Sequence, residues 1–178
     1  MIQLLLATFF SFSVFANVFT TDSARTVLDF QGNVIKRGVN DRSAAALIRP
    51  NGKQTLRIVL EVKDFQFATD FEYNEFNDEF LESHYFPQIR FTGELPPSVN
   101  TDRTGTYQAM VEGTLTIRQI SRKKIIPVNL TIRENEALVE FSETINLSDF
   151  NIPYAGPGSD IGSSGLMKFS GTLKKTQR

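Results

Sequence analysis

From residue 56 onward, apolar and polar residues alternate with a period of two along most of the chain. The segment 55–62, for example, places Leu56, Ile58 and Leu60 on one face and Arg57 on the other. Such alternation is typical of β-strands with one buried face. It predicts strands within residues 55–62, 64–71, 88–95, 107–117, 127–134, 137–147 and 165–175.

Three segments depart from this regular pattern. The inward positions change parity near Lys63 and Asp64, which predicts a bulge or a sharp bend there. Residues 23–36 alternate more weakly and predict a short hairpin or a pair of strands. In residues 73–83, Phe76 and Phe80 are spaced as i and i+4, which predicts one short amphipathic helix.

The number and spacing of these strands define the expected fold class. Many short antiparallel strands separated by turns predict an all-β domain, either a barrel or a sandwich, with at most one short helix. A length of 178 residues fits one domain. No internal repeat or low-complexity tract divides the chain, so we expect residues 17–178 to form a single domain.

Residues 1–16 form an apolar run, MIQLLLATFFSFSVFA. This run is short for a transmembrane helix but has the length of a signal-peptide core, and Val14 and Ala16 fit the −3 and −1 positions of a cleavage site. It predicts a signal peptide cleaved after Ala16 and a periplasmic or secreted protein without a stable membrane span. No Lys or Arg precedes the run, and the alternative is a buried first strand or helix of the domain.

Charge and cysteine content exclude several functions. The 19 Lys and Arg residues are balanced by 20 Asp and Glu residues, so the chain lacks the basic surface of a dedicated nucleic-acid-binding protein. The absence of Cys excludes disulfides, thiolate catalysis and Cys-ligated zinc. The 16 Phe residues supply much apolar area, which fits either a large core or the lining of an apolar pocket.

Polar residues with the spacing of a catalytic or metal site are scarce. His84, the single His, belongs to no HExxH or GxSxG motif, so we interpret it as a surface residue and expect no catalytic residue, metal ligand or cofactor. Residues 118–124 are expected to form a basic hairpin turn, and residues 156–165 a flexible loop at the mouth of a barrel. Six acidic residues lack the spacing of a calcium loop and are interpreted as a solvated helix face: Asp70, Glu72, Glu75, Asp78, Glu79 and Glu82.

Three segments, in order, resemble the YceI-like family, whose members are antiparallel barrels of lipocalin-like architecture. They are FLESHYFPQIRFTGEL at 80–95, VEGTLTIRQISRKKIIPVNLTI at 111–132 and INLSDFNI at 145–152. The likeness covers about Leu56 to Lys174. The residues that carry it are Phe86, Pro87, Ile89, Phe91, Gly113, Leu115, Thr116, Ile117, Ser148, Asp149, Phe150 and Ile152.

The chain departs from the family pattern at three places. The region 17–50 is shorter than the family's usual N-terminal hairpin, and Asp22-Ser23 stands nearest to the usual His-Ser pair. Gln119 and Asn151 stand where the family usually has Gly. A shortened first hairpin would narrow or open the barrel.

The resemblance implies a single lipocalin-like barrel of about eight strands with an elongated apolar cavity. Such a cavity would hold a polyisoprenoid, such as a quinone tail, or another long lipid, so the protein is expected to be a binding protein and not an enzyme. The sequence identifies no protein partner. The alternative is a barrel filled by its own side chains, which acts as a structural or protein-interaction module of the cell envelope. The expected ligand-binding residues are inward and apolar: Phe65, Phe67, Phe80, Phe86, Ile89, Phe91, Ala109, Val111, Leu115, Ile117, Phe141, Phe150 and Phe169.

Overall fold

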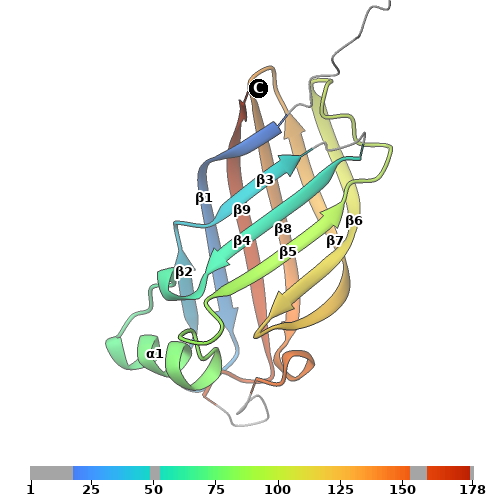
Figure 1. Ribbon diagram of the computed structural model, residues 1–178. Coiled ribbons are helices and arrows are strands. Elements are labelled where there is room, and N and C mark those ends of the chain that lie inside the picture. Colours follow the sequence, from blue (N-terminus) through green and yellow to red (C-terminus); the bar gives the residue numbers. More distant parts are fainter. Residues whose placement is uncertain (1–17, 49–52, 153–159, 177–178) are drawn as a thin grey trace, which may run out of the picture.

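The computed structural model describes residues 18–48, 53–152 and 160–176, which form a closed antiparallel β-barrel (Figure 1). The expected signal peptide, residues 1–16, lies outside the described residues. From β3 to β9, each strand pairs with the next along the chain, and β9 pairs with β1 to close the barrel. This closure distinguishes the barrel from the sandwich. The strands are β1 (Val18–Phe30), β2 (Arg37–Asn40), β3 (Ala44–Ile48), β4 (Thr55–Glu61), β5 (Gln88–Glu94), β6 (Gly105–Ile117), β7 (Ile120–Ile132), β8 (Glu136–Asn146) and β9 (Ser164–Thr176).

The short strands β2 and β3 share one position in the barrel. Thr26 of β1 lies opposite Asn40 of β2, and Phe19 of β1 lies opposite Leu47 of β3, so both strands keep the same register against β1. Counted together, they make the barrel eight-stranded, as the sequence predicted. The weak alternation of residues 23–36 therefore belongs to the β1–β2 hairpin, as predicted.

The period-two pattern places apolar side chains inside the barrel, as expected. Leu56, Ile58 and Leu60 are at most 2% exposed. The parity changes where β4 ends in a 3₁₀ turn, η2 (Val62–Asp64), which confirms the predicted sharp bend. The strand predicted over 64–71 is wrong: within this segment only Gln66 pairs, in one bridge with Val39, because a helix begins at Asp70.

A short helical segment covers one end of the barrel, at the lower left in Figure 1. Thr69 and Glu72 form a capping box, in which each side chain accepts a hydrogen bond from the other residue's backbone N–H, and this box starts α1 (Asp70–Asn74). The chain continues as a π-helical turn, η3 (Glu75–Phe80), which buries Phe76 and Phe80. The predicted short helix is confirmed, although it spans 70–80 and not 73–83.

Two tight turns explain departures from the family pattern. Arg118 and Gln119 alone connect β6 to β7, with φ angles of 49° and 63°. The turn predicted over 118–124 is wrong in length, because residues 120–124 already belong to β7. Asn151, with φ of 50°, follows the 3₁₀ turn η4 (Leu147–Phe150). Gln119 and Asn151 both have left-handed backbone, which Gly adopts most easily and Asn tolerates, so these are positions where Gly is favoured.

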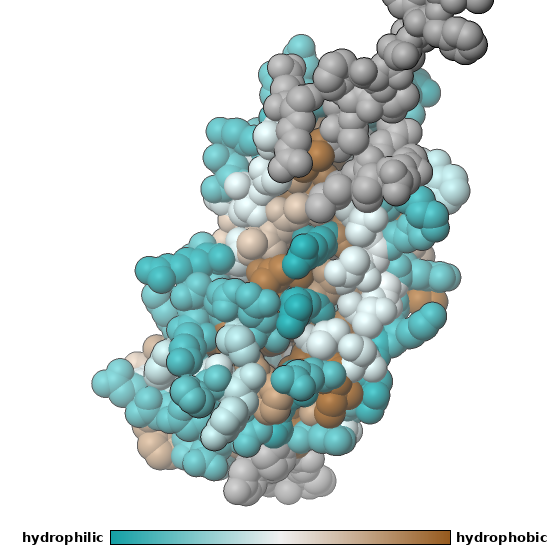
Figure 2. Space-filling model, viewed as in Figure 1, coloured by the Kyte–Doolittle hydropathy of each residue, from teal (hydrophilic) through white to brown (hydrophobic). Residues whose placement is uncertain are grey.

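The outer face of the barrel carries most of the charged side chains, and the face seen in Figure 2 is largely hydrophilic, with apolar side chains showing between polar ones.

Asp29 of β1 accepts hydrogen bonds from Lys168 of β9 at 2.8 Å and from Arg37 of β2 at 2.6 Å. The bond from Lys168, followed by that from Arg37, lowers the pKa of Asp29 against the opposing effect of burial. Among the described residues, no helix has the length and hydrophobicity needed to cross a membrane.

Candidate functional site

The interior of the barrel is one continuous apolar core. Eleven of the thirteen predicted ligand-binding residues are at most 6% exposed and belong to this core. Phe67 is half-buried and packs against the core, with its ring centroid 4.7 Å from that of Phe76. Phe86 lies beside the core under Arg118, whose guanidinium carbon is 5.6 Å from the ring centroid. The predicted set therefore gathers in the interior, apart from Phe86.

A small void lies inside the barrel near the end that the helical segment covers. Its volume is about 20 Å³, enough for about one water molecule, but every lining residue is apolar. Of the predicted residues, only Phe80, Ile89 and Ile117 line it. Among the described residues, the lining consists of Leu28, Phe30, Phe76, Phe80, Leu81, Ile89, Ile117, Ile145, Leu147, Ile152, Ile161 and Gly165.

Neighbouring side chains fill the space beside the small inward residues Gly93 of β5 and Gly113 of β6. Gly93 and Gly113 lie opposite each other, and a Cβ atom added to Gly113 would meet the Phe91 ring at 2.7 Å. A Cβ atom added to Gly93 would meet Val111 Cγ1 at 2.6 Å. The Phe91 ring and the Val111 side chain thus occupy the room that the glycines provide. In this conformation the middle of the barrel is filled.

An aromatic cluster closes the barrel beneath the helical segment. Phe76 stands at its centre, with ring centroids 4.7 Å from Phe67, 5.7 Å from Phe65 and 6.0 Å from Phe30. Phe30 and Phe76 also line the void. The aromatic cluster is therefore the wall that separates the void from the end of the barrel.

Two buried polar atoms next to this cluster lack a hydrogen-bond partner within the described part of the chain. They are Asn77 Oδ1 and Ser83 Oγ. A buried polar atom without a partner costs about 1–3 kcal/mol. Outward movement of the helical segment would let water reach both atoms. Among the described residues, these two unpartnered atoms thus lie at the helical end and not in the strand-paired wall of the barrel.

Arg118 links the β6–β7 hairpin by hydrogen bonds to the end of the barrel that the helical segment covers. It donates one hydrogen bond to the backbone oxygen of Asn151 at 2.9 Å and another to the carboxylate of Glu82. Its side chain is only 15% exposed. Arg118 therefore joins the residues that follow η3 and η4, a role that its place in a basic run did not indicate.

His84 is exposed, and its ring lies edge-on to Tyr85 with centroids 5.2 Å apart. The five acidic residues within 70–80 are exposed or half-buried, which confirms a solvated helix face for them. Glu82 was wrongly included in this face, because it follows the helical segment and pairs with Arg118. Across residues 18–48, 53–152 and 160–176, no three His, Asp or Glu side chains gather as a metal site would require.

The predicted flexible loop, residues 156–165, lies partly outside the described residues. In its described part, the Asp160 carbonyl accepts hydrogen bonds from the backbone of Val34 and Ile35, and Ile161 is 1% exposed. This part of the loop is held against the β1–β2 turn and contributes Ile161 to the void. Sequence alternation did not reveal Ile161, because the residue belongs to no strand.

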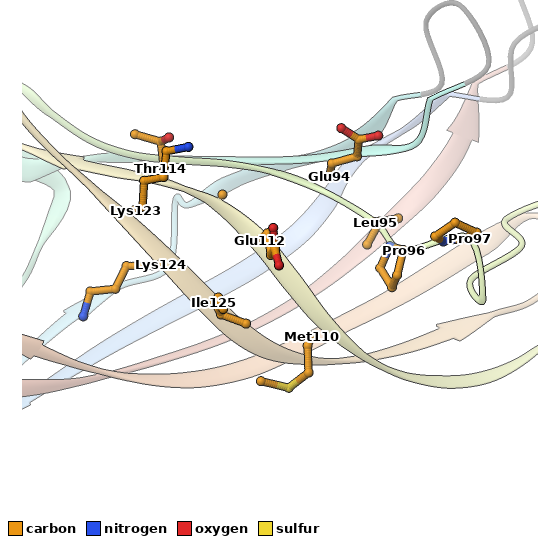
Figure 3. A pocket seen from close by; sticks show the side chains of 11 residues that line it. Glu94, Leu95, Pro96, Pro97, Met110, Glu112, Thr114, Lys123, Lys124 and Ile125 are labelled. Atoms are coloured by element: carbon orange, nitrogen blue, oxygen red, sulfur yellow. The ribbon is translucent and has the colours of Figure 1, made fainter.

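A second, larger hollow lies on the outer face of β5, β6 and β7 (Figure 3). This outer groove measures about 650 Å³, and its apolar side chains include Met110 and Ile125, which are 58% and 55% exposed. Glu94, Glu112 and Lys123 also line it. The outer groove is open to solvent, and Lys124 of β7 also lines it.

The fold and the apolar interior define a closed, eight-stranded antiparallel barrel of lipocalin-like architecture. The family model of the YceI-like domain matches residues 11–173. The chain therefore belongs to the YceI-like family, as its sequence motifs indicated. The match begins within the segment expected to be a signal peptide. A search of curated proteins gives no match to this chain.

Solved structures with the same fold cover nearly the whole chain. A polyisoprenoid binding domain from Saccharophagus degradans gives a TM-score of 0.72 at 11% identity, covering 91% of this chain and 99% of the other. BcnA of Burkholderia cenocepacia gives 0.68 at 15% identity, covering 84% and 95%. The YceI protein of Campylobacter jejuni gives 0.55 at 13% identity, covering 99% and 91%. At these identities, the likeness establishes the shared fold.

Proposed function

We propose that the protein is an exported carrier that holds a long apolar molecule, a polyisoprenoid or a similar lipid, inside its barrel. The observation that carries this proposal is the void at the helical end, whose described lining residues are all apolar. Apolar burial favours such a ligand by about 25 cal/mol per Å². The likeness to a structure described as a polyisoprenoid binding domain supports the same ligand class.

Binding requires the interior to expand. Ligand sites usually measure about 300–1,000 Å³, far more than the void. Phe76, Phe80 and Leu81 line the void from the helical segment, which contributes no strand to the sheet within the described residues. Moving this segment outward would enlarge the void without breaking strand pairing. The two unpartnered atoms of Asn77 and Ser83 lower the cost of that movement.

The filled interior favours a second candidate function. If the aromatic cluster does not move, the barrel has no room for a lipid, and the protein would act through its outer face. The outer groove, with the exposed side chains of Met110 and Ile125, would then offer a partly apolar surface to a partner. This second function is a structural or protein-interaction module of the envelope.

Mass spectrometry of lipid extracts distinguishes the two candidates. Protein purified from the envelope of a native-like host, without detergent, should release about one isoprenoid or similar lipid per chain into organic solvent. An equal amount of the same protein, unfolded and refolded without lipid, serves as the control and should release none. Repeated preparations that carry no lipid, together with refolded protein that takes up no added polyprenol, would favour the filled barrel.

Export is part of the proposal and rests on the apolar run at residues 1–16. We expect the intact mass of the protein recovered outside the cytoplasm to correspond to a chain that begins at Asn17. Cleavage after Ala16 follows from the small residues at the −3 and −1 positions. Recovery of folded protein that retains Met1 would show that the apolar run is not a cleaved leader.

A further inference from the structure

The wall of the barrel has a gap in its hydrogen-bonded ladder between β7 and β8. Val128–Ile132 of β7 pair with Ala137–Phe141 of β8, whereas residues 120–127 of β7 have no register partner on β8, although both strands are fully described. On their other sides, β7 pairs with β6 and β8 with β9 along their full lengths. The gap, which we call the β7–β8 seam, is therefore local.

Pro127 explains why the pairing between β7 and β8 stops at this position of the sequence. It immediately precedes Val128, the first residue of β7 along the chain that pairs with β8. Proline has no backbone N–H to donate and is favoured where a ladder ends. Next to the unpaired part of β7, η4 contacts both β7 and β8. Because the two strands form no backbone hydrogen bonds there, side chains must fill the space between them.

An ion pair bridges the seam at positions where apolar residues are expected. Glu143 lies between the buried Phe141 and Ile145 on the inward face of β8, opposite the interior residue Met167 of β9. Lys124 precedes the buried Ile126 by two residues on β7, is half-buried itself and also lines the outer groove (Figure 3). The Lys124 ammonium is 3.0 Å from the Glu143 carboxylate, and the two side chains are 19% and 15% exposed.

The ion pair of Lys124 and Glu143 lies close to the void inside the barrel. Ile145, which lines the void, is one inward position from Glu143, a spacing of about 7 Å along a strand. A mostly buried ion pair stabilises a fold no better, in general, than apolar side chains of similar volume. The pair places a mostly buried ammonium beside the inward face of β8, at a seam that no backbone pairing closes.

We infer that the seam binds the anionic head group of an amphiphilic ligand, whose apolar tail lies in the barrel. The inference rests on the proposed function. Lys124 donates hydrogen bonds to the carboxylate or phosphate oxygens of the head group, and Glu143 turns toward solvent when the ligand replaces it. Glu143 thus competes with the ligand for Lys124, so the two residues have opposite effects on affinity.

Calorimetric titration with geranylgeranyl phosphate and geranylgeraniol, which share one apolar chain, tests this site. A hydrogen bond to a charged group supports about a tenfold preference of the wild-type protein for the phosphate. Lys124→Met should lower the affinity for the phosphate about tenfold and leave that for the alcohol unchanged. Glu143→Gln should raise the affinity for the phosphate, because Lys124 is then free. Lys123→Met, an exposed neighbour on the same strand, is the control and should change neither.

A purely structural ion pair predicts a different result, in which Lys124→Met and Glu143→Gln change the binding of both ligands in the same direction. An equal loss of phosphate affinity in Lys123→Met would also overturn the inference, because it would indicate diffuse charge attraction. Should Lys124→Met unfold, the double variant K124M/E143M leaves no unpaired charge and should bind both ligands equally. Failure of the wild-type protein to bind either ligand would refute the carrier function itself, whereas equal binding of both would refute only the head-group site.

Discussion

Replacing Phe76 by Ala is expected to lower the free energy of unfolding by about 3–5 kcal/mol, the usual loss for a buried Phe. Phe76 is 2% exposed and contacts the rings of Phe30, Phe65 and Phe67. Removal of its ring would leave a cavity beside the existing void, and the surrounding strands cannot collapse to fill it. A domain with a stability in the middle of the usual range, about 10 kcal/mol, would remain folded.

Urea unfolding of the two variants Phe76→Ala and Phe71→Ala measures this effect against a matched control. Phe71 belongs to the same helical segment but is 60% exposed, so its replacement should change the free energy by no more than about 0.5 kcal/mol. The urea dependence of both variants should match that of the wild-type protein. A loss below about 1 kcal/mol for Phe76→Ala would show that the aromatic cluster does not close the barrel.

The period-two pattern made the wall of the barrel predictable, because each strand has one face in the core and one in solvent. Leu56, Ile58 and Leu60 illustrate this, since their alternation alone assigns them to the interior. Alternation could not distinguish a barrel from a sandwich, because closure depends on the pairing of β1 with β9, which are far apart in the sequence. The family resemblance supplied that distinction.

The contents of the interior were less predictable than its wall. The resemblance implied an elongated apolar cavity, but the Phe91 ring lies against Gly113 and fills the room beside it. The void instead lies where Leu28 and Ile161 meet the helical segment. These residues come from remote parts of the chain, and their meeting depends on tertiary packing that a single sequence does not encode as a local pattern.

The sequence indicated the roles of the polar residues even less clearly than the contents of the interior. Arg118 stood in a basic run and was interpreted as part of a long turn, because a two-residue turn normally carries Gly or Asn. Its partners Glu82 and Asn151 lie more than thirty residues away on either side. Lys124 and Glu143 interrupt alternating apolar positions, and this interruption was the available sign of the β7–β8 seam.

If a lipid enters the barrel, we expect a large change in the environment of the interior residues that are fully packed without it. Met167 is 1% exposed on the inward face of β9, next to Gly165 of the void lining in the inward row. Met110 is 58% exposed in the outer groove. A ligand that enters the barrel must displace atoms near Met167, whereas one that binds outside contacts the groove of Met110.

A chain that begins at Asn17 contains only these two methionines, so labelling of the methionine methyl groups gives one NMR signal for the interior and one for the exterior. The measurement is a titration of the labelled protein with a polyprenol. The carrier function predicts that the Met167 signal moves or is replaced by a new one as the ligand binds, while the Met110 signal stays in place. Movement of the Met110 signal at saturation, with that of Met167 unchanged, would contradict the binding of a lipid inside the barrel.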